Sequence, residues 1–167
     1  MLKPVDIAVL CALISWPPGE DWTQATVAHE IGISQSNVHR ALRQLERSGL
    51  WSGRAPRKTA VKELLAHGVR YVYPPELGPP TRGLPTAHAG PATAGQLVVP
   101  QPYVWPWEAG IAFGPALEPL HPCVPGAAST HPQFHELMAV VDVFRVGRAR
   151  EVRIAEDWLN RKLGLDR

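Results

Sequence analysis

The chain of 167 residues is long enough for one well-packed core, or for one small domain with an appendage. Its hydrophobic content of 45% is that of an ordinary globular protein and excludes disorder throughout the chain. The net charge of +2 is unevenly distributed, because residues 40–70 carry eight arginines and lysines against two glutamates. Such clustering fits a surface that meets phosphates, although a basic run alone is more often only a solvated face.

The sequence also bears on the compartment. No apolar run approaches the length of a membrane span, and the N-terminal residues do not have the pattern of a signal peptide. The two cysteines, Cys11 and Cys123, do not form a disulfide framework. We therefore expect a cytoplasmic protein with no membrane partner.

The first predicted element is a helix from about Pro4 to Ser15. Proline is well tolerated in a first helical turn, and the segment from Trp16 to Gly19, which reads WPPG, ends the helix. One apolar stripe at helical spacing is predicted to face the core. This stripe consists of Ile7, Leu10, Cys11 and Ile14.

Two further helices are predicted around a sharp turn. Thr23 is a plausible N-cap of the first, and Gly32 at its end can adopt a positive φ. Ser34 is expected to cap a second helix that runs from about Gln35 to Ser48 and stops at Gly49. The apolar residues predicted to face inward are Ala25, Val27, Ala28, Ile31, Ile33, Val38, Ala41, Leu42 and Leu45.

Four features occur together here in a combination that is rare in a plain helical hairpin. They are the small residue Ala28, the turn at Gly32, the cap at Ser34 and the basic exposed face of the second helix. Over residues 4–60 this pattern resembles the winged helix-turn-helix of MarR-like and related bacterial regulators, down to the closing LERSGL before the wing. The resemblance implies that the helix of residues 35–48 enters the major groove of DNA. The alternative is a winged helix kept only for protein contacts.

The exposed face of this second helix carries side chains suited to DNA. Glutamine and asparagine can pair with adenine and arginine with guanine, so Gln35, Asn37 and Arg40 are the candidates for reading bases. Short hydroxyls at a helix N-terminus and further arginines suit phosphates. The candidates for phosphate contacts are Ser34, Ser36 and Arg43, with Arg47 assigned either to this set or to a surface ion pair.

The expected wing is reduced. Residues 52–58 are basic and turn-like, but residues 59–68 read as a short helix capped by Thr59 and ended by Gly68, and residues 69–73 as a strand. The basic residues of the turn would still lie near the DNA backbone. The complete predicted DNA-binding set is Ser34, Gln35, Ser36, Asn37, His39, Arg40, Arg43, Arg47, Arg54, Arg57 and Lys58.

The fold class predicted for the whole chain is α+β. A winged helix-turn-helix at 1–74 precedes a proline-rich, loop-rich layer at 75–130, which holds most of the 18 prolines, and two helices at 131–167. Short strands are predicted in the middle layer at 97–99, 103–107 and 111–113. The terminal helices, separated at Gly147 and ended at Gly164, are expected to pack on the first helix or to form a dimer seam. Their apolar stripes are Phe134, Leu137, Met138, Val141 and Phe144, then Ile154, Ala155, Trp158, Leu159 and Leu163.

Chemistry other than DNA binding finds little support in the sequence. His121, Cys123, His131 and His135 lie close together, but their spacing is not a standard zinc pattern, so no metal is expected. No phosphate loop and no local catalytic set is present, so neither a cofactor nor an enzyme is expected.

The function predicted from the sequence is a dimeric transcriptional regulator, most simply a repressor, that reads a DNA operator with residues 34–47. A second interpretation is an antitoxin or other interaction protein that binds a partner through its middle and C-terminal regions and also regulates its own operon. An exposed aromatic patch of Tyr103, Trp105, Trp107 and Phe113 would serve that role. A third is a small-molecule sensor, which would need a pocket between the middle layer and the winged helix.

Overall fold

The computed structural model describes residues 1–166. It begins with three helices, α1 (Pro4–Ile14), α2 (Gln24–Ile31) and α3 (Gln35–Arg47). Both predicted caps are present: the Thr23 hydroxyl accepts from the Thr26 amide, and the Ser34 hydroxyl accepts from the Asn37 amide, each at 3.1 Å. These bonds satisfy amides that the helices themselves leave without partners.

The turn between α2 and α3 depends on Gly32. Its φ is +70°, in the left-handed region that a side chain disfavours, and its amide donates back to carbonyl groups at the end of α2. Ile33 then packs against the core while Ala25 is exposed, so the prediction that Ala25 faces inward is wrong. The predicted helix-turn-helix is otherwise present.

The wing is a minimal hairpin. Strands β1 (Trp51–Ser52) and β2 (Ala55–Pro56) have two residues each and are antiparallel. Gly53 takes a φ of +63° in the turn, and its carbonyl accepts a 2.8 Å bond from the Trp51 indole. The expectation of a reduced wing is confirmed.

The chain after the wing is helical throughout, so the strand predicted at 69–73 is wrong. Helix α4 (Lys58–Glu63) continues through a π-helical turn (Leu64–Gly68) into α5 (Val69–Val72), and Gly68 does not end the helix. Val61, Leu65 and Val69 are completely buried at intervals of four residues. This helical period prevails over the β-branched and aromatic composition of residues 69–73.

Three strands form a small sheet that closes on itself. β3 (Leu77–Thr86) is antiparallel both to β4 (Tyr103–Pro106) and to β5 (Ala112–Leu117), and β4 meets β5 in parallel at Val104 and Ala116. β4 matches the strand predicted at 103–107, and β5 overlaps the one predicted at 111–113 but continues to Leu117, whereas β3 was not predicted. The strand predicted at 97–99 is wrong, because Leu97 makes only an isolated bridge with Ala94.

The close approach of the strands requires a glycine at position 83. Gly83 is paired with Pro106 on one side and with Ala112 on the other. A Cβ at this position would collide with the Trp105 carbonyl. Proline and glycine in β3 made the segment look like a loop, yet here glycine permits the sheet to close.

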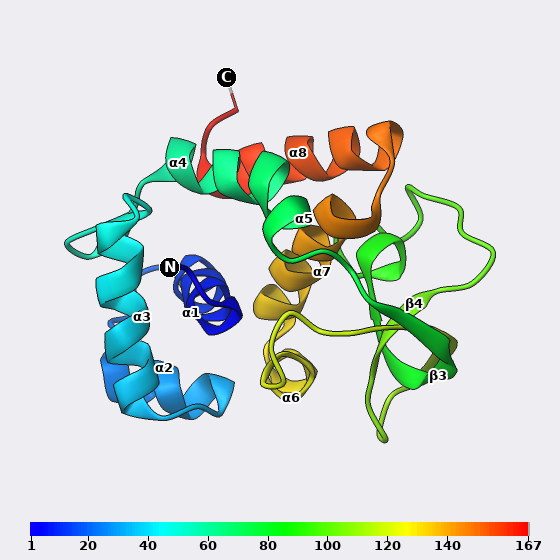
Figure 1. Ribbon diagram of the computed structural model, residues 1–167, viewed down its shortest axis with the longest axis horizontal. Coiled ribbons are helices and arrows are strands. Elements are labelled where there is room, and N and C mark those ends of the chain that lie inside the picture. The colour runs from blue at the N-terminus through cyan, green and yellow to red at the C-terminus, as the bar shows by residue number, and fades with distance from the viewer. Residues whose placement is uncertain (167) are drawn as a thin grey trace.

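The C-terminal region contains α6 (Val124–Thr130), which was not predicted, and the two expected helices, α7 (Pro132–Val146) and α8 (Ala149–Leu163). The breaks fall as predicted, at Gly147 and at Gly164, whose φ is +69°. A short 3₁₀ turn (Ala87–Ala89) follows β3 and contacts α7. Figure 1 shows α7 in the middle, with α2 and α3 on one side, the strands on the other, and α4 and α8 along the top.

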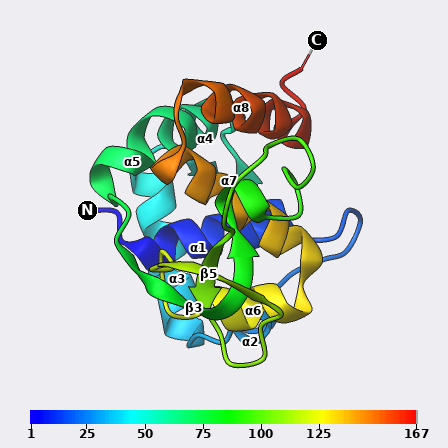
Figure 2. The ribbon, with the colours of Figure 1, turned by 90° about the vertical axis from the view of Figure 1, so that its right-hand side faces the viewer.

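One hydrophobic core runs through the whole molecule. Helix α1 is buried on all sides from Asp6 to Leu13, not along one stripe as predicted, because α7 covers the face that α2 and α3 leave free. Of the two terminal helices, α7 packs on α1 as one of the predicted roles had it, whereas α8 packs on α7 and α4. In Figure 2 the strands lie in front of this helical core and α8 crosses above it.

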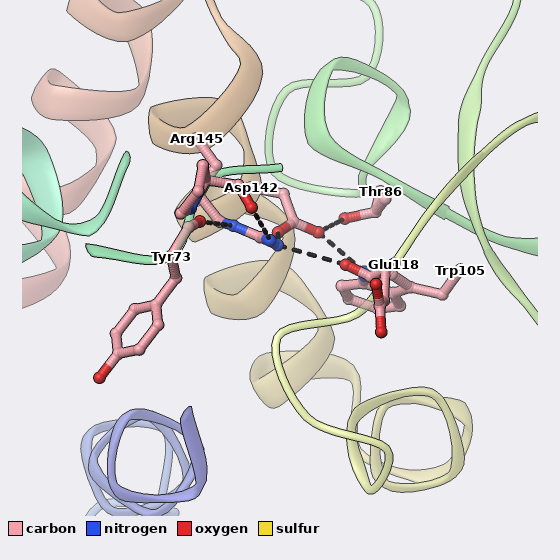
Figure 3. A network of polar contacts seen from close by, with 7 residues as sticks. Tyr73, Thr86, Trp105, Glu118, Asp142 and Arg145 are labelled. Atoms are coloured by element: carbon pink, nitrogen blue, oxygen red, sulfur yellow. Dashed lines mark hydrogen bonds and ion pairs between the residues drawn. The ribbon is translucent and has the colours of Figure 1, made fainter. Parts of the chain in front are cut away.

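A buried ion pair fastens the sheet to α7 (Figure 3). Asp142 and Arg145 form a 2.8 Å salt bridge, and the same carboxylate accepts 2.7 Å bonds from the Thr86 hydroxyl and the Trp105 indole. Arg145 also donates to the Tyr73 carbonyl at 2.9 Å. The group thus joins β3, β4, α7 and the segment after α5 through a single carboxylate.

The position of Trp105 in this group corrects the predicted aromatic patch. Its side chain is completely buried, and Tyr103 and Trp107 are half-buried. Phe113 alone of the four is well exposed, at 67%. Both central residues of β4, Val104 and Trp105, are completely buried, and the indole N–H finds a partner inside, so the four residues do not form an exposed surface.

Candidate nucleic-acid interface

Helix α3 lies at the edge of the molecule opposite the sheet, with the wing loop on the same edge (Figure 1). Its inward face consists of Val38, Ala41 and Leu45, which are completely buried. Because these three residues fix the rotation of the helix, the polar residues between them must point outward. Asn37 is half-buried, and the predicted residues that are exposed are Ser34, Gln35, Ser36, His39, Arg40, Arg43 and Arg47.

Several of these side chains are available for a ligand. Within residues 1–166, Gln35, Arg43 and Arg47 make no side-chain hydrogen bond or ion pair, which leaves Arg47 without the surface ion pair considered above. In contrast, Arg40 donates to the Asn37 amide oxygen at 2.5 Å. This bond holds two candidate base-reading side chains together on successive turns of α3.

The N-terminal end of α3 can receive an anion. The Ser34 hydroxyl, which caps the helix, lies 3.2 Å from the Ser36 hydroxyl, and both residues are exposed. Unpaired backbone amides and the helix dipole make the first turn of a long helix favourable for phosphate. The two serines therefore lie where a phosphate of the DNA backbone is expected in this class of motif.

An open groove of about 670 Å³ separates α3 from the N-terminal segment. Lys3 lines it together with Arg40, Arg43 and Arg47, while the acidic lining residues are Asp6 and Glu46. Burial raises the pKa of Asp6, which accepts a bond from the Lys3 amide. Lys3 was not predicted, because only the packing of α1 against α3 brings the two segments together.

The wing arginine Arg54 turns back onto the helix-turn-helix. Its guanidinium lies 4.3 Å from the centre of the Trp22 ring and donates to the Trp22 carbonyl at 3.0 Å. Trp22 in turn packs edge-on against Trp51, with ring centres 6.1 Å apart. Arg54 therefore fixes the hairpin against the start of α2 while it remains exposed.

The other two basic residues of the wing region differ from each other. Arg57, the residue before α4, is exposed. Lys58 is also exposed, but its ammonium group lies beside Gly164 at the C-terminal end of α8. The negative end of that helix dipole favours a cation there.

The suspected metal ligands are not brought together. His131 bonds to the Glu30 carboxylate, His135 to the Pro85 carbonyl at 2.7 Å, and His121 accepts from the Cys123 amide at 3.1 Å. Burial lowers the pKa of His121 and raises the pKa of Cys123 to about 11. Nowhere in residues 1–166 do three or more potential ligands cluster as a metal site requires.

Comparison with known proteins gives one match. Residues 8–50, which span α1 to α3, match the IclR helix-turn-helix domain. No curated protein and no solved structure matches the chain. Across the described residues there is no helix with the length and apolar character needed to cross a bilayer.

The match corrects one part of the sequence interpretation. The winged helix-turn-helix class is supported, but the matching domain is of the IclR type and not specifically MarR-like. The caps at Thr23 and Ser34 and the turn at Gly32 all lie within the matched residues. Residues 8–50 are therefore similar to the IclR helix-turn-helix, a DNA-binding domain of transcriptional regulators.

Proposed function

We propose that this protein is a sequence-specific transcriptional regulator that reads a DNA operator with residues 34–47. The observation that carries the proposal is the outer face of α3. It is exposed and basic, and it projects from a helix whose inner face is fixed by buried Val38, Ala41 and Leu45. The IclR-type domain over residues 8–50 supports the same function.

Each part of this face has a distinct role in the proposal. Gln35 and the bonded pair of Asn37 and Arg40 read base edges in the major groove. Arg43 and Arg47 line the groove toward Lys3, and these three cations bind phosphates. The phosphate contacts fix the position of the domain, and the base contacts supply the specificity.

The test is binding to fragments of the upstream region of its own gene, titrated against salt. A site-specific complex is expected, with affinity that falls steeply with salt because each phosphate contact adds about 0.9 to the slope of log K against log [salt]. The Arg43→Ala and Arg47→Ala variants should each reduce that slope by about one unit. Arg150→Ala, at an exposed position at the start of α8, serves as the control. A folded protein that binds no fragment at low salt would refute the proposal.

Repression by a dimer is part of the same proposal. Two copies on a palindromic operator would place two α3 helices about one turn of DNA apart. The apolar residues of α7 pack within one chain, so the dimer must form through another surface. Light scattering of the free protein and of its DNA complex gives the number of copies, and a single copy in both would contradict the dimer.

The interaction-protein alternative has less support from the geometry. It depended on an exposed aromatic patch, and Trp105 at the centre of that patch is buried against Asp142. A partner protein would therefore need a different surface, and none of the four aromatic residues but Phe113 is well exposed.

A further inference from the structure

A pocket of about 390 Å³ lies between the helix-turn-helix and the start of α7. The end of α1 and the following turn contribute Trp16 and Glu20 to its wall, and α2 contributes Glu30. Across the pocket are His131 and Phe134, which belong to the junction of α6 and α7 and to the first turn of α7. The pocket therefore lies between the DNA-binding helices and the rest of the molecule.

Two polar contacts bridge the two sides of this pocket. The Ser15 hydroxyl donates to the Gln133 carbonyl at 3.3 Å, and His131 bonds to the Glu30 carboxylate. Both contacts join residues more than 100 positions apart in the sequence. The Glu30 carboxylate thus has two functions here, because it lines the pocket and holds α2 to the start of α7.

The lining has the chemistry of a site for an organic cation. Ala12, Ile31, Phe134 and the Trp16 ring give it apolar walls, while Glu20 and Glu30 are its acidic residues. His131 is its one basic residue, and it is already bonded to Glu30. The buried Trp16 indole nitrogen has no hydrogen-bond partner within residues 1–166.

We propose that this pocket binds a small organic amine, with its apolar body against Trp16 and Phe134 and its ammonium group between Glu20 and Glu30. The pocket is large enough for a single aromatic ring with a short aminoalkyl chain. Charge complementarity selects a cation over a neutral or anionic molecule of the same shape.

The bound amine would also act on DNA binding, a step that rests on the proposed function. Its ammonium group competes with His131 for Glu30, which releases one of the two polar contacts that bridge the pocket, the one that holds α2 to the start of α7. Because α2 supports α3, the amine and DNA become coupled ligands. By linkage, DNA must change the affinity for the amine by the same factor as the amine changes the affinity for DNA.

The first experiment measures amine binding without DNA. Tyramine is titrated into ¹⁵N-labelled protein, and the Trp16 indole signal is assigned with the Trp16→Phe variant. Saturable displacement of that signal is expected, with much weaker effects from 4-ethylphenol and 3-(4-hydroxyphenyl)propionate. No displacement by tyramine up to about 10 mM, where a good pocket binds even a fragment, would overturn the proposal, as would equal binding of the anion.

Matched variants then test the carboxylates. Glu20→Gln and Glu30→Gln should each weaken tyramine binding by about tenfold, the usual effect of removing one charge-assisted contact. Glu63→Gln, at an exposed residue of α4 outside the pocket, should leave the affinity unchanged. Unchanged binding in both pocket variants would overturn the assignment of the ammonium group.

The coupling is measured separately, as tyramine affinity in the presence and absence of the DNA fragment that the protein binds. A difference that matches the change in DNA affinity with tyramine is expected. Equal tyramine affinities would overturn the coupling, while the amine site itself is judged by the first experiment. Failure to bind DNA would count against the proposed function and leave the amine titration unaffected.

Discussion

A single carboxylate, that of Asp142, shows how one residue can hold distant elements together. It accepts from Thr86, Trp105 and Arg145 in an interior where only 1% of Asp142 is exposed. Burial acts to raise the pKa of such a carboxyl, whereas the three donors favour its charged form. The consequence is that each partner depends on the others to remain satisfied.

Removing this carboxylate should therefore be costly. Asp142→Ala leaves the Arg145 guanidinium buried without its counter-charge, and we expect unfolding to require about 3–5 kcal/mol less free energy. Urea denaturation followed by tryptophan fluorescence measures the loss. Asp157→Ala, at an exposed position of α8, is the control. Equal midpoints for the two variants would contradict the structural role given to Asp142.

Arg40 provides the residue-scale test of DNA recognition. Arg40→Ala removes a guanidinium that is exposed and oriented by Asn37, so specific binding should weaken by about 1–3 kcal/mol while stability is unchanged. Competition between the operator and a scrambled duplex measures the effect. If affinity for both duplexes falls equally, Arg40 contacts phosphate and does not read a base.

The cysteines offer a test that depends on pH. Burial raises the pKa of Cys123 to about 11 and that of Cys11 to about 12. The reactive thiolate of Cys123 is therefore scarce at pH 8, and its alkylation rate should rise about tenfold per pH unit toward pH 11. Iodoacetamide labelling read by mass spectrometry follows both sites, and urea-unfolded protein is the control. Rapid labelling of folded Cys123 at pH 7 would contradict this environment.

Among the elements, those with local signals could be predicted and the others could not. Helices α1 to α3 are marked by proline at the start, hydroxyl caps and glycine at the turn, all of which act within a few residues. Strand β3 is rich in proline and glycine and exists only because β4 and β5 pair with it. Helix α5 looks like a strand in composition, but it packs on α7 as a helix.

A substitution at Gly32 tests the conformation of the turn between α2 and α3. Gly32→Ala places a side chain at a φ of +70° and should cost about 1–2 kcal/mol of stability, although no atom would block the added Cβ. Gly126→Ala is the matched control, because its φ is not positive and the new Cβ meets Trp107 at an ordinary 3.6 Å. That variant should be neutral or slightly stabilising. Thermal unfolding of both variants measures the effect. Equal changes in Tm would contradict the view that the positive φ at Gly32 causes the loss of stability.

For the whole molecule, the candidate site resembles the fold in that the sequence predicts the parts with local signals and misses the others. The outward face of α3 followed from periodicity alone, since Val38, Ala41 and Leu45 mark the opposite side. Three other features arise from contacts between segments remote in sequence. They are the addition of Lys3 to the groove, the contact of Arg54 with Trp22 and the position of Lys58 beside Gly164. A single sequence carries no direct signal for such contacts.

The continuous core leads to a prediction about cooperativity. The division into segments 1–74, 75–130 and 131–167 remains a prediction. Because α7 covers α1, the first and last of these segments share one core, and we expect them to unfold together. Leu137 is completely buried in α7, so Leu137→Ala should cost about 2–5 kcal/mol. If the core is one cooperative unit, hydrogen exchange should accelerate equally for the most protected amides of α1, α7 and α8.

The exposed Leu77 provides the control, because Leu77→Ala should change exchange little at any of these helices. Independent segments would give a different pattern, in which Leu137→Ala accelerates exchange in α7 and α8 while α1 keeps its protection. Equal acceleration would mean that the DNA-binding helices derive part of their stability from the C-terminal region. A ligand bound between α2 and α7 could then act on α3 through the same core.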